Sequence, residues 1–233
     1  MTDLDDLLDD IFDGKRPALY SEFAGWVQGS RRFSAFAARY RGKIRSKLKS
    51  ARDEGGLQDL RAELQTAVLL LRDKRFTLEY EKYAASKQGG PDFTVTFKTH
   101  IPFNVEVRRI RSVELADADA DGRVGKVIAV LCDKARQMPP SVVNLLWLHA
   151  EPEISEADLS RAGMILRGLA ERQIEDFFMR RGFESAASFL KHYHHLSGIV
   201  LRQSSEQVLW LNALARHRVP REIVTAIQRL GTL

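Results

Sequence analysis

Two neighbouring stretches of alternating residues carry the acidic and basic side chains that could do chemistry together. Apolar residues alternate with polar ones over 92–98 and again over 103–108. This period of two is typical of half-buried strands. Because a short turn near His100 separates the stretches, the sequence predicts a β-hairpin with one apolar face and one polar face.

The polar face of this hairpin holds two carboxylates and a guanidinium. With the turn centred near His100, Thr94 lies opposite Glu106. In the same register Asp92 lies opposite Arg108. The Cβ atoms of directly opposed residues are about 5 Å apart on a common face. We therefore expect Asp92, Glu106 and Arg108 to form one cluster, and clustered carboxylates are suitable ligands for a divalent cation.

A third carboxylate comes from the helix that precedes these strands. Residues 57–73 place Leu60, Leu64 and Leu71 on one apolar face. At about 100° per residue, Glu63 falls on the flank of that face, where it could reach the rim of a sheet beneath the helix. An exposed glutamate on the helix surface is the alternative interpretation.

The order of these residues resembles the core signature of the PD-(D/E)XK nuclease superfamily, which has the restriction-endonuclease-like fold. Pro91-Asp92, followed by the segment EVR that begins at Glu106, is similar to the family's two-part motif. The helix RAELQTAVLLL, which contains Glu63, is similar to the acidic first helix of that core. The motifs are short, so their order along the chain carries more weight than any single match.

The resemblance implies a metal-dependent nuclease that hydrolyses phosphodiester bonds in DNA. It covers about residues 57–150 and implies an α/β fold with an αβββαβ core, to which helical N-terminal and mixed C-terminal segments are added. In this interpretation Asp92 and Glu106 hold Mg²⁺ or Mn²⁺. Glu63 binds a second ion or orients a coordinated water molecule.

Arg108 departs from the family's pattern, because the family has a lysine at this position. A guanidinium, with a pKa above about 12, cannot exchange a proton, but it can hold a phosphate oxygen and stabilise developing charge. Whether the protein is an enzyme therefore stays open. One alternative is a nuclease-like protein that binds nucleic acid or a protein partner without cleavage. The other is a structural hairpin in which Asp92 pairs with Arg108. Glu106 would then pair with Arg109 or Lys98.

The stretch 15–52 has an excess of basic residues on a predicted helix, which we expect to end near Gly55 and Gly56. Glu22 is its one acidic residue, whereas ordinary solvated helices mix both signs. A cationic face of this kind can neutralise phosphates along a nucleic-acid backbone, and a solvated surface helix is the alternative. The residues predicted to contact DNA are Arg31, Arg32, Arg41, Lys43, Arg45, Lys47 and Lys49.

The stretch 1–13 places leucine, isoleucine and phenylalanine at helical spacing between aspartates, which predicts an acidic amphipathic helix. Its apolar face either docks on the chain's own domain or binds a protein partner. A regulatory protein that acts through this acidic arm is therefore a further hypothesis.

The pattern predicts three successive segments. Residues 1–56 form the acidic arm and the basic helical segment, 57–150 form the nuclease-like core, and 151–233 form helices and short strands packed on that core. Within the core, residues 75–83 predict a first strand. A helix over 123–138 and a buried strand over 142–148 complete the αβββαβ order.

The composition limits the kinds of protein to which this chain can belong. The chain has 233 residues, of which 44% are hydrophobic, and this length is enough for one good core. A net charge of +5 favours a polyanionic partner such as DNA. The single cysteine excludes an intrachain disulfide and a cysteine-based zinc site, and it fits the cytoplasm. No apolar run approaches about 18 residues, so we expect no membrane span, while homo-oligomer formation stays open.

Overall fold

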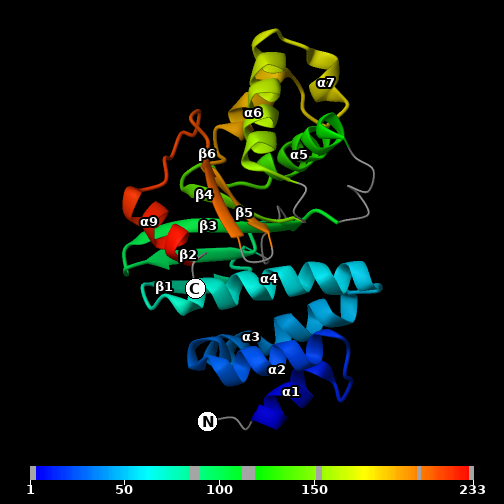
Figure 1. Ribbon diagram of the computed structural model, residues 1–233, viewed down its shortest axis with the longest axis vertical. Helices are drawn as coiled ribbons and strands as arrows, with labels where there is room; N and C mark the ends of the chain where they lie inside the picture. Colours follow the sequence, from blue (N-terminus) through cyan, green and yellow to red (C-terminus); the bar gives the residue numbers. More distant parts are fainter. Residues whose placement is uncertain (1–3, 84–89, 112–118, 151–153, 204–205, 231–233) are drawn as a thin grey trace.

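The chain folds around an open, mixed sheet with the strand order β1-β2-β3-β4-β5-β6 (Figure 1). The computed structural model describes residues 4–83, 90–111, 119–150, 154–203 and 206–230. β3, β4 and β5 run parallel, and the other neighbours are antiparallel. The strands are β1 Phe76–Tyr80, β2 Phe93–Phe97, β3 Ile101–Arg109, β4 Val143–His149, β5 Gly198–Gln203 and β6 Glu206–Leu211.

Helices cover both faces of this sheet, which confirms the α/β class. α4 lies on one face with α3, α2 and α1 stacked outside it, and α5 and α6 lie on the other side (Figure 1). The helices are α1 Leu4–Phe12, α2 Leu19–Gly29, α3 Arg31–Ser50, α4 Glu54–Arg72, α5 Ala120–Ala135, α6 Glu156–Glu171, α7 Glu175–Met179, α8 Ala186–Tyr193 and α9 Arg221–Leu230.

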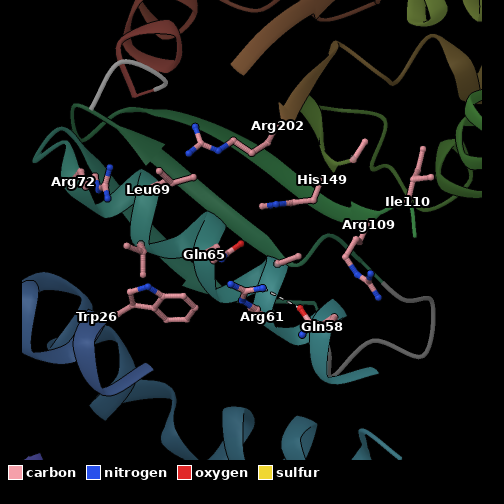
Figure 2. Close-up of a pocket in the computed structure, with 13 residues that line it drawn as sticks. Trp26, Gln58, Arg61, Gln65, Leu69, Arg72, Arg109, Ile110, His149 and Arg202 are labelled. Atoms are coloured by element: carbon pink, nitrogen blue, oxygen red, sulfur yellow. Dashed lines mark hydrogen bonds between the residues drawn. The ribbon is translucent and has the colours of Figure 1, made fainter. Parts of the chain in front are cut away.

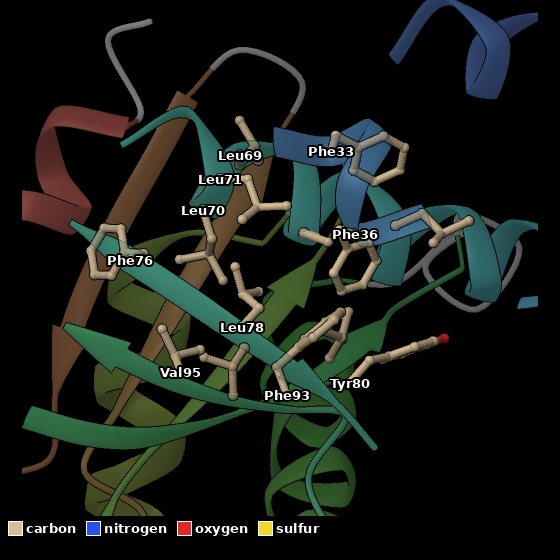
Figure 3. Close-up of a cluster of buried hydrophobic side chains, with 14 of the residues drawn as sticks. Phe33, Phe36, Leu69, Leu70, Leu71, Phe76, Leu78, Tyr80, Phe93 and Val95 are labelled. Carbon is tan, nitrogen blue, oxygen red and sulfur yellow. The ribbon is translucent and has the colours of Figure 1, made fainter. Parts of the chain in front are cut away.

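The sheet divides the apolar interior into two cores. β4 is apolar on both faces, because Leu145 and Trp147 point to the α4 side. Leu146 and Leu148 point to the α5 side. Figure 3 shows the core on the α4 side, where aromatic rings of α3, β1 and β2 meet a row of leucines from α4. Burial on both faces explains the nearly continuous apolar run that predicts this strand.

The helices and strands predicted for the central segment are found close to their expected bounds. The first strand is β1, the helix over 123–138 is α5, and the buried strand over 142–148 is β4. Along the chain, α4, β1, β2, β3, α5 and β4 follow one another in that order. In the part of the chain that the structure describes, no helix has the length and apolarity needed to cross a membrane.

The basic stretch 15–52 contains two helices rather than one. Ser30 separates them, and its side chain accepts a hydrogen bond from Phe33 N at the start of α3. The expected helix end near Gly55 is wrong, because α3 ends at Ser50. Asp53 caps a new helix by accepting from Gly56 N at 2.8 Å, so both glycines belong to the first turn of α4.

The hairpin of β2 and β3 is present, but its predicted register is wrong by two residues. Thr94 pairs with Asn104, not with Glu106. The turn centres on Thr99, because Lys98 and Thr99 both adopt positive φ, 57° and 103°, and reverse the chain one residue early. A two-residue shift keeps every side chain on its predicted face but changes its neighbours across the strands.

The acidic arm docks on its own chain. Among the described residues of the arm, which begin at Leu4, the apolar side chains of Leu7, Leu8, Ile11 and Phe12 are buried. Asp10 pairs with Arg41 and Arg45 of α3. Asp13 pairs with Lys49. The arm therefore covers part of the basic helix and neutralises the positive charge of that part.

Arg32 joins α3 to the segment between α4 and β1, and we expect its removal to destabilise the fold. Its guanidinium donates to the carbonyl oxygens of Leu71 and Asp73, both at 2.7 Å, and to that of Phe76. Arg32→Ala leaves these carbonyls without a charged donor and is expected to lower the free energy of unfolding by about 2–4 kcal/mol in urea denaturation. Arg31→Ala, which removes an exposed neighbour, is the matched control. Equal losses for both variants would contradict the structural role.

Candidate active site

Three carboxylates from separate segments converge beside β2 and β3. Asp92 immediately precedes Phe93, whose partner is Val105, so it lies alongside Glu106. Its Oδ2 accepts the backbone N–H of Val107 at 2.8 Å, which fixes the carboxylate against β3. Glu63 reaches the same place from α4. One lysine Nζ lies 2.6 Å from Glu63 Oε2 and 3.6 Å from Asp92 Oδ1.

Two lysines supply positive charge to this group. Lys47 of α3 is the lysine shared by Glu63 and Asp92, and its Nζ also lies 2.9 Å from Glu81 Oε1. Lys134 of α5 contacts Glu106 Oε1 at 2.7 Å from the other side of the sheet. We call these six residues the carboxylate cluster: Glu63, Glu81, Asp92, Glu106, Lys47 and Lys134. Four carboxylates against two ammonium groups leave two negative charges when all six are ionised.

Burial sets the protonation of the cluster. It raises the pKa of Glu63 to about 7, helped by the negative charge of Asp92, and Lys47 only partly offsets this. Burial and Asp92 likewise raise the pKa of Glu106 to about 7. Lys47 behaves in the opposite way: burial disfavours its charge, but Glu63 and Asp92 outweigh burial and raise its pKa. Near neutral pH Lys47 is therefore charged, while Glu63 and Glu106 carry part of a proton each.

One carboxylate oxygen of Glu106 has no hydrogen-bond partner among the described residues. Its Oε1 accepts from Lys134, but Oε2 is buried and has no hydrogen-bond partner. A buried acceptor without a donor costs free energy, which a bound cation could recover. In the described part of the chain, no three His, Cys, Asp or Glu side chains are already arranged around a metal position. The unsatisfied Oε2 and the excess of carboxylates over lysines nevertheless fit a divalent ion held by Asp92 and Glu106.

The raised pKa of Glu106 predicts how its contribution to stability changes with pH. Between about pH 4.5 and 7 the folded protein binds a proton at Glu106 that the unfolded chain has released. The contribution of this proton to the free energy of unfolding therefore falls as pH rises. Glu106→Gln removes this contribution. The free energy of unfolding of the wild type relative to Glu106→Gln is expected to fall by on the order of 3 kcal/mol from pH 5 to pH 8. Urea denaturation of both proteins at the two pH values measures it, and a constant difference would contradict it.

Arg108 does not join the carboxylates. Alternation along β3 puts it on the same face as Glu106, but it lies two residues further on, beside Leu148 of β4. It forms no ion pair with Asp92 or Glu106 among the described residues. The predicted contact between Asp92 and Arg108 depended on the register that proved wrong by two residues.

The salt-bridged hairpin that the sequence left open has different partners. Lys98 pairs with Glu222 of α9 rather than with Glu106. Arg109 pairs with Asp59 of α4 at 3.0 Å. The cations that balance the carboxylates therefore come from helices, α3 and α5, and not from the hairpin itself.

Most of the basic residues predicted to contact DNA make internal contacts. Arg41, Arg45 and Lys49 pair with aspartates of α1 or of the residue following it. The ammonium of Lys43 donates to the carbonyl oxygens of Tyr80 and Glu81, both at 2.8 Å. Arg32 and Lys47 have the buried roles described above. Arg31 is exposed at the start of α3.

Sequence reasoning missed Lys134 as a member of the site, although a signal for it exists. Lys134 follows Val127 by seven residues and Leu131 by three, so it continues the buried stripe of α5. A lysine on an apolar helix face must find a partner inside the fold. Tyr80, whose hydroxyl donates to Glu63 Oε2 at 2.6 Å, was also missed because its position in β1 looks purely apolar.

Comparisons of the chain with models of protein families, with curated proteins and with solved structures find no match. The side chains of the carboxylate cluster are therefore the evidence for the function of this chain.

Proposed function

We propose that this protein is a metal-dependent nuclease that hydrolyses phosphodiester bonds in DNA. The observation that carries the proposal is the meeting of Glu63, Asp92 and Glu106, from three separate segments, with Lys47 and Lys134. Carboxylates that share a site with lysines can bind a divalent ion on one side and a phosphate on the other.

The arrangement of the surrounding elements supports a restriction-endonuclease-like core. The order α4, β1, β2, β3, α5, β4 follows the αβββαβ pattern that the resemblance implies. β1, β2 and β3 form an antiparallel meander, and β4 adds in parallel next to β3. In this interpretation α4 carries the first acidic residue, the start of β2 the second and β3 the third.

The three carboxylates that the sequence predicts have distinct roles in the proposed reaction. Asp92 and Glu106 would hold the ion, and Glu63 would orient a water molecule. Asp92 would bind the ion through Oδ1, because Oδ2 is already held by the N–H of Val107. Lys47, whose Nζ lies 3.6 Å from Oδ1, would have to move aside. A bound Mg²⁺ or Mn²⁺ would neutralise phosphate charge and lower the pKa of a coordinated water molecule.

Lys134 takes the role that the resemblance assigns to a lysine in the second motif. It lies 2.7 Å from Glu106 Oε1 and is largely buried, so its ammonium is held at the edge of the proposed ion site. Unlike the guanidinium of Arg108, an amine can exchange a proton as well as stabilise a phosphate oxygen. Arg108 is thus not needed for this role.

A second candidate is a nuclease-like protein that binds a partner without cleaving it. The observation that favours it is the position of Lys47, which pairs with three carboxylates. Entry of an ion between Glu63 and Asp92 requires Lys47 to move. If Lys47 stays in place, the cluster is a structural ion-pair network.

A cleavage assay with a metal titration separates the two candidates. Purified protein is incubated with supercoiled, linear double-stranded and single-stranded DNA in MgCl₂, in MnCl₂ or in EDTA. We expect cleavage of at least one substrate that depends on the metal. Absence of cleavage in every condition, together with calorimetry that detects no Mn²⁺ binding, would contradict the nuclease; Mn²⁺ binding without cleavage would favour the second candidate.

A further inference from the structure

A polar cavity lies on the side of α4 away from Glu63. It measures about 600 Å³ and lies between α2, α4 and the ends of three strands (Figure 2). Among the described residues, its lining contains four arginines, Arg61, Arg72, Arg109 and Arg202, and no aspartate or glutamate. Cavities of this size accommodate small molecules. We call it the arginine pocket.

Strand register builds the wall of the arginine pocket on the sheet side. Arg109 of β3 pairs with His149 of β4, and His149 pairs with Arg202 of β5. These three residues therefore form one row at the carboxyl ends of three parallel strands, all on the face that α4 covers. Ligands commonly bind beyond the carboxyl ends of parallel strands, where side chains of adjacent strands converge.

The arginines divide into a paired and an unpaired set. Arg61 is held by Glu22, with Nε–Oε2 at 2.5 Å and Nη2–Oε1 at 3.1 Å. Arg109 is held by Asp59. Arg72 and Arg202 form no ion pair with a described residue, and Nη1 of Arg202 is buried without a hydrogen-bond partner. Within the part of the chain that the structure describes, two guanidinium charges are thus left in the pocket for a ligand.

The unpaired guanidinium groups repel each other. Burial and the charge of Arg72 both lower the pKa of Arg202, which indicates that the two groups lie near one another without a shared anion. His149 adds no charge, because burial together with Arg202 and Arg109 lowers its pKa to about 4. Its Nε2 lies 2.8 Å from the hydroxyl of Thr66. An anion with two negative charges would balance the two free guanidinium groups.

Trp26 forms the wall of the arginine pocket on the α2 side. Its indole is fixed by edge contacts with the rings of Phe23 and Phe33, at 6.3 and 5.9 Å between centroids. The indole lies across the pocket from Arg202 and His149 (Figure 2). A rigid aromatic surface opposite guanidinium groups suits a ligand with a planar ring and an anionic end, since bases stack on such rings.

We propose that the arginine pocket binds the phosphate group of a nucleotide, with Arg72 and Arg202 on the phosphate and Trp26 against the base. Arginine holds phosphate through parallel N–H donors, and a phosphomonoester carries close to two negative charges at neutral pH. The ligand is either a free nucleotide or the phosphorylated end of a nucleic-acid strand, which present the same chemistry. This site does not depend on the carboxylate cluster, which uses other residues.

Calorimetry with adenosine 5′-monophosphate as the probe tests the site. The wild-type protein is expected to bind it at least about tenfold more tightly than adenosine, because the phosphate makes the charged contacts. Arg72→Gln and Arg202→Gln are each expected to weaken binding by roughly 10-fold or more. Arg167→Gln, which removes an exposed arginine paired with Glu171 on the opposite face of the sheet, is the matched control and is expected to change binding by less than about twofold.

Several outcomes would overturn the proposal. The first is that the wild type does not bind the nucleotide. The second is that neither pocket substitution changes its affinity for the nucleotide, and the third is that Arg167→Gln loses as much affinity as the pocket variants do. Arg72 is exposed at the end of α4, so its substitution keeps the test decisive even if Arg202→Gln does not fold. Competition by a 5′-phosphorylated oligonucleotide, but not by its 5′-hydroxyl form, assigns the strand end as the ligand. If the protein binds the nucleotide and neither oligonucleotide competes with it, the ligand is the free nucleotide.

Discussion

Asp92→Asn is expected to lower the rate of metal-dependent DNA cleavage by at least about 1,000-fold, with the fold retained. The change removes the negative charge that the proposed ion needs, and loss of several kcal/mol of transition-state stabilisation corresponds to this factor. Asparagine keeps a side-chain oxygen that can accept the N–H of Val107. The measurement is the initial cleavage rate at saturating Mg²⁺, with thermal denaturation to confirm folding.

Asp9→Asn is the matched control for this prediction. Asp9 is exposed on α1, so the same chemical change there is expected to leave the rate within about twofold of the wild type. If Asp92→Asn cleaved DNA as fast as Asp9→Asn, any activity in the preparation would come from a contaminant or from another site. The proposed roles of Asp92 and Glu106 would then be abandoned.

Lys134→Met is expected to lower the free energy of unfolding by about 3–5 kcal/mol at pH 8, because it leaves the buried carboxylate of Glu106 without its cation. The Lys134 and Glu106 side chains are 14% and 8% exposed, so solvent cannot replace the lost partner. The loss is expected to be smaller at pH 5, where Glu106, with its raised pKa, is protonated and needs no counter-charge. Urea denaturation at both pH values measures the effect.

Two comparisons make this second prediction specific. Lys82→Met removes an exposed lysine that pairs with Glu79, and little change is expected. In the double variant Glu106→Leu with Lys134→Met, both charges are gone, so most of the stability is expected to return. If Lys134→Met lowered the free energy of unfolding by less than about 1 kcal/mol at pH 8, the buried carboxylate of Glu106 would not need this ion pair for stability.

The positions of most helices and strands could be predicted from the sequence because their signals are local. Alternation at period two marks β1, β2 and β3, and an apolar run marks β4. Where the prediction was wrong, a short local feature set the helix boundary or the strand register. Asp53 caps α4 and draws Gly55 and Gly56 into the helix. Positive φ at Lys98 shifts the hairpin register.

The candidate site was predictable in part. The order of Glu63, Asp92 and Glu106 along the chain, with the strand pattern, suggested that these carboxylates share a site, and the fold brings them together. Their counter-ions were not predictable, because a lysine's partner depends on which helix crosses which strand. Lys47, which the sequence predicts as a phosphate contact, is 25% exposed and pairs with the carboxylates.

The apolar face of each helix and strand follows from the amino-acid sequence alone, because the periods of helix and strand are properties of short segments. The neighbours across those faces depend on how the elements pack in space. Trp26, Arg72 and Arg202 are far apart in the sequence and meet in the arginine pocket because α2, α4 and β5 converge there. Lys134 reaches Glu106 because α5 packs on the face of β3 opposite α4. Charge pairing acts across space rather than along the chain, so a linear pattern cannot specify it.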